Sequence, residues 1–461
     1  MLVDSRGVAF TAANQAAVDA FDRTVDAYLR FGRNTGDLLR QVGAADADMP
    51  MAHVLRGYFF HLMGNAALQP RARRALDAAE AASARLLPRE RMHVAALAAW
   101  CDGDLWRTVA ILEELLIDHP RDVLALKIAH FIHFYTGEVQ HHRDSVARVL
   151  YAWDESVPGY GFVLGMRAFG LEEAGEYAEA ERLGRRAVEM APADAWAGHA
   201  VAHVMEMQGR HREGIAWIEA HEADWEQANN FAYHLWWHRS LYHLALEQHD
   251  AVLDLYDRRV RADLSDDYLD ITNATSLLLR LDMRGVDVGD RWGELADKAR
   301  TRIHDHIFPF IDAHFMMPLA VTGDRARCED FIVSMRGWAD AHREASMSPI
   351  VDEVGLPLSE AVYAYGSGDY GAVVDLLMPV RYRIQRVGGS HAQRDVFQQM
   401  LIESALRAGR APIARALLTE RRASKPFSPA AWKNYARALD SLGDADGAAE
   451  ARRQAEALLA A

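Results

Sequence analysis

Cysteine is scarce in this sequence, and long apolar runs are absent. The 461 residues include 2 cysteines, so disulfide bonds cannot organise the fold, and a reducing compartment such as the cytoplasm is expected. No apolar run reaches 18 residues, so we expect no membrane-spanning helix. The first residues also lack the apolar core of a signal peptide.

Positive charge is in deficit. The chain has 51 Lys and Arg residues against 66 Asp and Glu residues, which gives a formal net charge of −15 at pH 7. Proteins that bind nucleic acids or anionic membranes through a general surface carry the opposite sign. We therefore expect neither a nucleic-acid partner nor a membrane partner. Common catalytic signatures are missing as well: the sequence has no HExxH, GxSxG or CxxC motif.

Helical repeats are the main pattern that is present. When Pro192 is taken as position 32 of a 34-residue unit, Ala168, Ala180 and Ala187 fall where two paired helices would touch. Gly175 lies where the first helix of the pair would end. This spacing predicts an all-α tetratricopeptide-like helical-repeat solenoid, an α-α superhelix, over 1–461. An unrelated helical bundle is the alternative.

The same spacing recurs along the chain. We expect one helical-repeat domain whose clearest units are 89–122, 161–194, 195–228, 354–387, 395–428 and 429–461. No alternating strand pattern competes with them, so the helix content should exceed half of the residues.

Polar residues occupy the inward positions of one unit. In this repeat type the first helix lines the inner surface, and unit 195–228 places Trp196, His199, His203 and Glu206 at its inward positions. His199, His203 and Glu206 are spaced i, i+4, i+7 and share one stripe of a helix. Two imidazoles and a carboxylate could bind a divalent metal ion or move protons. Alternatively, these side chains only hydrogen-bond within the groove.

Further His, Asp and Arg residues follow. His234 and His238, with Trp237 beside them, are expected on a neighbouring helix, where they could face His199 and His203 or simply form an aromatic core. Asp312 and His314 are only two residues apart, so at most one of them should face a site on a regular helix.

A Gly-Gly turn introduces the last polar group. A helix is expected to start near His391, with Gln393, Arg394 and Asp395 close to its N-terminus. Arg394 there could clamp a carboxylate or phosphate. The alternative is a structural salt bridge from Arg394 to Asp395 or Asp312.

Several longer motifs carry a family resemblance. They are RDSVARVL (143–150), FGLEEAGEYAEAE (169–181), AHVMEM (202–207), WWH (236–238), RGVDVGDRW (284–292), DAHF (312–315), VGLPLSEA (354–361), and RYRI with GGSHAQRDVF (381–397). In their order, the chain resembles the tetratricopeptide repeat protein 38 family over nearly its whole length. The resemblance adds Asp270 to the candidate residues. The chain departs from the family pattern at His391, where Asn is expected, and at Asn273, where Asp is expected.

Two functions compete. The first is a site that binds an anionic small molecule and transforms it by hydrolase- or lyase-like acid–base or metal-assisted chemistry, with a divalent metal ion as a candidate cofactor. The second is a scaffold that binds a protein or peptide in the concave groove without catalysis. Homo-oligomer formation is left open. The catalytic candidates are His199, His203, Glu206, His238 and His314; the binding candidates are Trp196, His234, Trp237, Asp270, Asp312, Gln393, Arg394 and Asp395; the candidate metal ligands are His199, His203 and Glu206.

Overall fold

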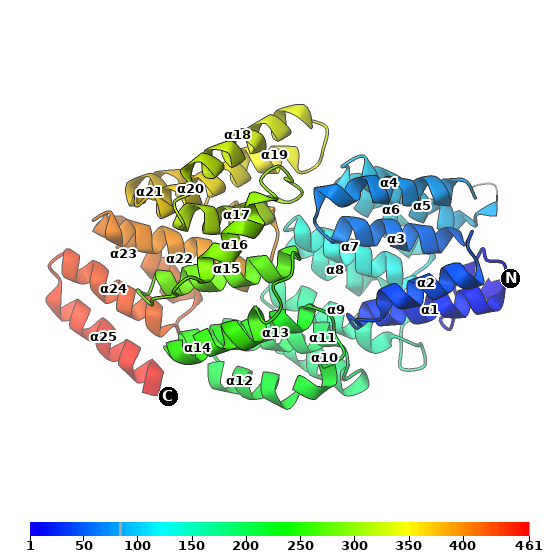
Figure 1. Ribbon diagram of the computed structural model, residues 1–461. Coiled ribbons are helices and arrows are strands. Elements are labelled where there is room, and N and C mark those ends of the chain that lie inside the picture. Colours follow the sequence, from blue (N-terminus) through cyan, green and yellow to red (C-terminus); the bar gives the residue numbers. More distant parts are fainter. Residues whose placement is uncertain (83–84, 461) are drawn as a thin grey trace. The chain divides into compact units, whose positions relative to one another are not determined.

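Almost every element of the protein is a helix (Figure 1). The computed structural model describes residues 1–82 and 85–460. By the contacts within the chain, these residues form two compact units. The first unit comprises Met1–Val201, His221–Ala232 and Asp340–Pro349, and the second comprises Ala202–Ala220, Tyr233–Ala339 and Ile350–Ala461. The expectation of one domain over 1–461 stays a prediction.

The described residues of the first unit form ten complete α-helices. They are α1 (Gln15–Leu29), α2 (Thr35–Ala45), α3 (Pro50–Leu62), α4 (Gln69–Glu80), α5 (Pro88–Cys101), α6 (Leu105–Asp118), α7 (Val123–Tyr135), α8 (Val139–Val149), α9 (Tyr160–Glu173) and α10 (Tyr177–Met190). The strands β1 (Leu2–Val3) and β2 (Ala9–Phe10) pair antiparallel and form the one sheet found in the described residues. The short helices are η1 (Ala66–Leu68), η3 (Leu150–Ala152) and η4 (Glu222–Trp225).

The second unit continues the same construction. Its complete α-helices are α12 (His211–Ala220), α14 (His249–Leu255), α15 (Tyr268–Asp282), α16 (Arg291–Arg300), α17 (Pro309–Val321), α20 (Leu356–Gly366), α21 (Tyr370–Leu377), α22 (His391–Arg407), α23 (Ala411–Ser424), α24 (Pro429–Ser441) and α25 (Ala445–Ala460). Its short helices are η5 (Tyr256–Val260), η6 (Val351–Gly355) and η7 (Ile384–Val387). The division between the units falls inside α11 (Ala195–Gln208), α13 (Phe231–Ala245), α18 (Arg325–Ala341) and α19 (Ser348–Ile350).

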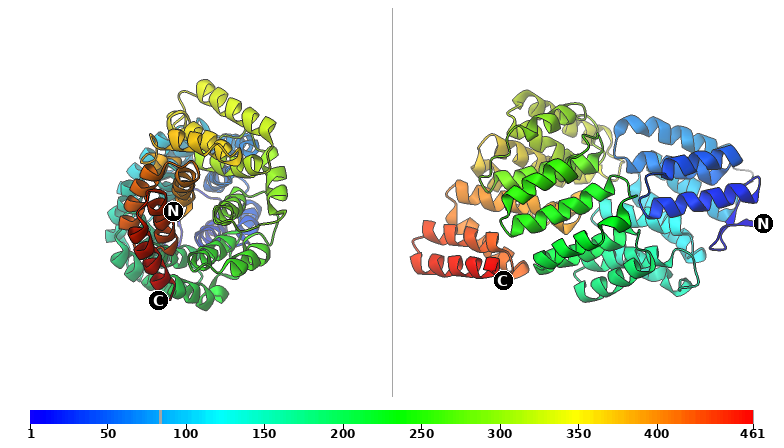
Figure 2. Two further views of the ribbon diagram at one scale, coloured as in Figure 1. Left: turned by 90° about the vertical axis from the view of Figure 1, so that its left-hand side faces the viewer. Right: turned by 60° about the horizontal axis from the view of Figure 1, so that its bottom comes forward.

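Consecutive helices pack as hairpins, as Figure 2 shows from two further sides. Each expected repeat unit contains one helix pair; for example, unit 161–194 holds α9 and α10, and unit 429–461 holds α24 and α25. Several turns between paired helices use glycine with positive φ, and Gly175 and Gly209 lie 34 residues apart, as Gly409 and Gly443 do. The predicted all-α helical-repeat fold is therefore confirmed.

The helices of a pair differ in burial. In the first unit, α9 is buried along most of its length, whereas α10 buries one face. In the second unit, α15 and α16 differ in the same way. The first helix of each such pair is therefore buried on nearly all sides, whereas the second buries one face. In the part of the chain that the structure describes, no helix is long and apolar enough to cross a membrane.

Candidate functional site

Two arginines of the second unit lie at the end of α15. Arg280 is 2% exposed, although the rest of this turn is leucine. Its guanidinium donates to the backbone carbonyls of Ser276 at 3.0 Å and Ala392 at 2.7 Å. Arg284, one turn later and half-buried, donates to the carbonyl of Arg280 at 2.7 Å and to Oε1 of Gln399 at 3.2 Å.

These two guanidinium groups are bound by neutral oxygens. Among the described residues, neither Arg280 nor Arg284 lies within ion-pair distance of a carboxylate. Burial lowers the pKa of each to about 10, although the charge of Asp395 acts against this shift. Both groups are still protonated at neutral pH, so they present positive charge that lacks a direct counter-ion.

A third arginine and a lysine come from α23 and the turn after it. Arg421 pairs with Asp395 of α22 through two contacts, at 2.7 and 3.0 Å. Lys425 lies 3.5 Å from the same carboxylate, and the amide of Gln399 donates to it at 2.5 Å. Burial opposes ionisation of Asp395, but the charges of Arg421 and Lys425 outweigh it and hold the pKa well below its usual range.

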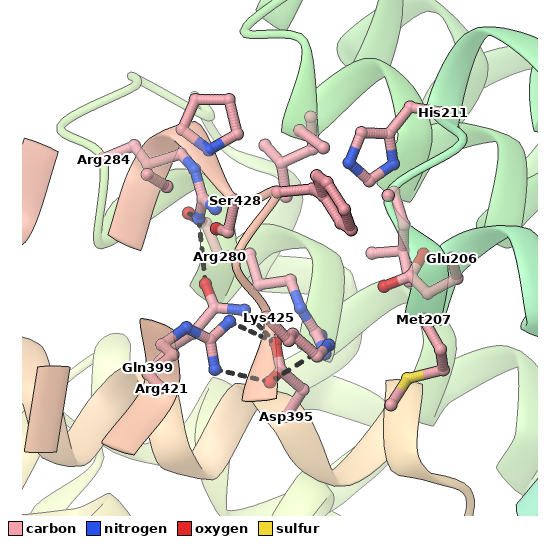
Figure 3. Close-up of a pocket in the computed structure, with 17 residues that line it drawn as sticks. Glu206, Met207, His211, Arg280, Arg284, Asp395, Gln399, Arg421, Lys425 and Ser428 are labelled. Atoms are coloured by element: carbon pink, nitrogen blue, oxygen red, sulfur yellow. Dashed lines mark hydrogen bonds and ion pairs between the residues drawn. The ribbon is translucent and has the colours of Figure 1, made fainter. Parts of the chain in front are cut away.

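Together these side chains line a small cavity, which we call the cationic pocket (Figure 3). Its volume is about 70 Å³. Four cationic side chains and two carboxylates line it, in a chain whose formal net charge is −15. The lining residues that carry the argument are Glu206, Arg280, Arg284, Asp395, Arg421 and Lys425. Its positive charge is thus a local reversal of the charge of the whole chain.

A larger cavity of about 570 Å³ adjoins the cationic pocket, and we call it the outer cavity. The two share Arg284, Gln399, Arg421 and Ala430 as lining residues. Further cations of the outer cavity are already paired. Arg407 and Arg437 each contact Glu403 at 2.7 Å, and Lys433 contacts Glu247 at 2.5 Å.

Three predicted histidines come together elsewhere in the second unit. His203 of α11 and His238 of α13 have ring centroids 4.4 Å apart, and His234 lies 4.8 Å from His238. All three are at most 3% exposed. The ring of His234 also stacks on Trp237, with centroids 5.1 Å apart. We call these three residues the histidine cluster.

Trp196, His199 and Glu206 complete the predicted inner stripe. Trp196 and His199, in the first-unit part of α11, pack their rings against Phe169 and Phe231. Glu206 lines the cationic pocket. The metal and catalytic roles expected for His199, His203 and Glu206 stay predictions.

Asp312 and His314 of α17 point to different neighbours, as their spacing predicts. His306 Nδ1 lies 3.3 Å from Asp312, and burial raises the pKa of this aspartate. His314 donates through Nδ1 to the carbonyl of Phe310 at 2.7 Å. Burial lowers the pKa of His314 to about 3. Neither residue is among those that line the two cavities.

Asp270 is fully buried near the start of α15 and accepts a hydrogen bond from the hydroxyl of Ser265. This contact links the loop before α15 to its first turn. Asp270 does not line the cationic pocket or the outer cavity. Its role in binding a ligand stays a prediction from the family resemblance.

The Gly-Gly segment forms a local cap. The helix α22 begins at His391, as predicted, and Ser390 and Gln393 bond reciprocally to each other's backbone as a capping box. Arg394 donates to the carbonyl of Gly389. Asp395 pairs with Arg421, and the alternative of a structural salt bridge from Arg394 to Asp395 or Asp312 stays a prediction.

Sequence reasoning missed the arginines that line the cationic pocket. The available signal was the segment LLLRL, in which Arg280 interrupts a run of leucines on one helix. A charged residue on an otherwise buried helix needs a partner or a function.

Comparison with known proteins finds only distant similarities. No protein-family model matches the sequence. A solved structure of the human IFIT1 dimer with PPP-AAAA has 12% sequence identity and a TM-score of 0.37, covering 96% of this chain and 89% of that chain. The TPR domain of P58(IPK) has 11% identity and a TM-score of 0.22, covering 80% of this chain and 93% of that chain. The protein is a tetratricopeptide-like helical-repeat protein.

Proposed function

We propose that the second unit binds a small molecule through a phosphate or carboxylate group held in the cationic pocket. The observation that carries this proposal is the pair Arg280 and Arg284, two guanidinium groups that line a cavity and contact only neutral oxygens. Guanidinium groups are the side chains best suited to bind carboxylate and phosphate, because they offer parallel donors.

Burial supports an anionic ligand. Moving a charge out of water is costly unless an opposite charge is supplied nearby. The lowered pKa values of Arg280 and Arg284 express that cost, and Asp395 is already bound by Arg421 and Lys425. An anion bound between Arg280 and Arg284 would offset this cost of burying their charges.

The sizes of the cavities suggest how a ligand would lie. A volume of about 70 Å³ suits one anionic group, since a water molecule occupies about 30 Å³ in the liquid. The adjoining 570 Å³ would hold the rest of the molecule. A negatively charged group of the ligand in the outer cavity would have to compete with Glu403 for Arg407 and Arg437.

The motif resemblance extends this proposal. We propose membership of the tetratricopeptide repeat protein 38 family and a cytoplasmic location, in keeping with 2 cysteines in 461 residues. Acid–base or metal-assisted chemistry on the ligand stays a prediction. A peptide scaffold is the alternative, in which an acidic residue or a C-terminal carboxylate of a peptide would enter the same pocket.

The test is anion binding by calorimetry. Inorganic phosphate, pyrophosphate and citrate are titrated into the wild-type protein and into Arg284→Met. We expect Arg284→Met to weaken binding by about 1.5–3 kcal/mol, the contribution of a hydrogen bond to a charged group. Arg258→Met is the matched control, because Arg258 is exposed and pairs with Asp254 in the same unit.

The outcomes separate the alternatives. Unchanged binding by Arg258→Met and weakened binding by Arg284→Met support the pocket. Equal binding by wild type and Arg284→Met would contradict anion binding in the cationic pocket. Binding of an acidic peptide, with none of the three free anions bound, would favour the scaffold.

A further inference from the structure

The histidine cluster has the composition of a metal site. One ligand nitrogen from each of His203, His234 and His238 lies within 4.8 Å of the others. Two of the residues are one turn apart on α13, and the third comes from α11. Helices hold such side chains more rigidly than loops do, so a small inward movement of the rings would bring three nitrogens around one ion.

A second residue orients one of the rings. His234 Nδ1 lies 2.9 Å from Oδ1 of Asn273 on α15, and this oxygen accepts the proton of Nδ1. The lone pair of His234 then resides on Nε2. Metal-binding histidines commonly donate their other nitrogen to an oxygen in this way, which fixes both the tautomer and the ring orientation.

We infer that His203, His234 and His238 bind a divalent transition-metal ion, with zinc as the best match. Three imidazoles with an open fourth position are a ligand set used by catalytic zinc sites. Imidazole also suits Cu²⁺, Ni²⁺ and Fe²⁺ but not the hard cations Mg²⁺ and Ca²⁺, which take oxygen ligands. This inference does not depend on the anion proposed for the cationic pocket.

A purely structural histidine group looks different in this protein. In the first unit, His130 and His142 stack with centroids 3.8 Å apart and share a contact of 3.0 Å between their Nε2 atoms. The indole of Trp196 also donates to His130 Nε2. Hydrogen bonds among two imidazoles and an indole account for that arrangement.

One neighbouring charge opposes the ion. Arg280 contributes to the lowered pKa of His238, although less than burial and the other two imidazoles do. The same charge repels any metal ion placed there. A bound anion in the cationic pocket, which Arg280 also lines, would offset it.

The experiment is Co²⁺ and Zn²⁺ binding by the full-length protein, purified without a histidine tag and stripped with a chelator. Co²⁺ titration is followed by visible absorption, and Zn²⁺ affinity by competition with a chromogenic chelator. We expect one ion per chain, with the absorption of a four-coordinate Co²⁺ site. His238→Gln should weaken Zn²⁺ binding at least 100-fold, and Asn273→Ala should weaken it about 10-fold to 100-fold.

The matched control is His306→Gln. His306 is also buried in the second unit, but it bonds to Asp312 and Ser334 outside the cluster, so its loss should leave metal affinity unchanged. If His238→Gln does not fold, X-ray absorption of the Zn²⁺-loaded wild type decides, because three imidazoles give a distinct scattering pattern. Wild-type protein that takes up neither ion stoichiometrically, or an X-ray spectrum without imidazole scattering, would overturn the inference.

Discussion

Lys127 is a buried cation surrounded by aromatic rings in the first unit. It is 1% exposed, and its Nζ lies 4.3 Å from the ring centre of Trp196, 4.5 Å from that of Phe131 and 5.1 Å from that of Phe31. Burial lowers the pKa of Lys127, whereas the charge of Asp194 acts against this shift. The two residues therefore stabilise each other's charge at a position that water does not reach.

Replacing one of Lys127 and Asp194 should lower the free energy of unfolding more than replacing both. We expect Lys127→Met and Asp194→Asn each to lower the free energy of unfolding by about 3 kcal/mol, because each leaves one buried charge without its partner. Asn at 194 can still accept the backbone hydrogen bonds that Asp194 takes from Trp196 and Ala197. The double variant should lose less than either single variant. Urea denaturation gives all four values, and additive losses would contradict a coupled pair.

The residues that sequence reasoning placed correctly are those governed by local rules. The start of α22 at His391 follows from the Ser390–Gln393 capping box, a pattern contained within four residues. The cationic pocket could not be found in this way, because Arg280 and Asp395 are far apart in sequence and meet only when helices pack. Gln393 was predicted to bind a ligand, and its side chain is used for the cap.

At the level of helices, the turn between paired helices is the most regular feature. In the α9–α10 pair, Gly175 adopts a φ of 83°, and its N–H bonds to the carbonyl of Glu172. The turn from α13 to α14 has the same hydrogen bond, from Glu247 to Leu244, but Glu247 adopts a φ of 59° with a side chain present. This conformation costs a residue other than glycine about 1–2 kcal/mol.

Glu247→Gly should therefore stabilise the protein. The substitution removes the backbone strain and also removes a partly exposed ion pair with Lys433, which contributes about 0–1 kcal/mol. We expect a net gain of about 0.5–1 kcal/mol in the free energy of unfolding. Glu247→Ala is the control, since it loses the ion pair and keeps the strain. Denaturation that ranks Ala above Gly would show that the turn is not strained.

The helix pairs were predictable because their signals repeat within 34 residues. Gly409 and Gly443 mark two such turns, and small residues such as Ala414 and Ala448 are buried where the helices meet. The open groove expected from this repeat type stays a prediction. The first helices, such as α9 and α17, are apolar on nearly all sides, and such helices are buried in a core.

Buried neutral histidines are a property of the whole molecule, since they occur in both units. Burial lowers their pKa values from the ordinary value of 6.5. The lowered values are about 4 for His61 and His133, and about 3 for His142, His234 and His314. In the unfolded chain the same side chains would titrate near 6.5.

This difference predicts that stability falls as the pH drops below 6.5. Between pH 6.5 and the folded pKa values, the unfolded chain binds more protons than the folded one, so each histidine destabilises the fold by about 1.4 kcal/mol per pH unit. In the metal-free protein, we expect His314→Asn to reduce the slope of the unfolding free energy against pH between pH 6 and 5. The reduction should correspond to about one bound proton. His304→Asn is the control for the substitution itself, because His304 is exposed. Urea denaturation across this range measures both, and equal slopes for wild type and His314→Asn would mean that His314 is not held neutral by burial.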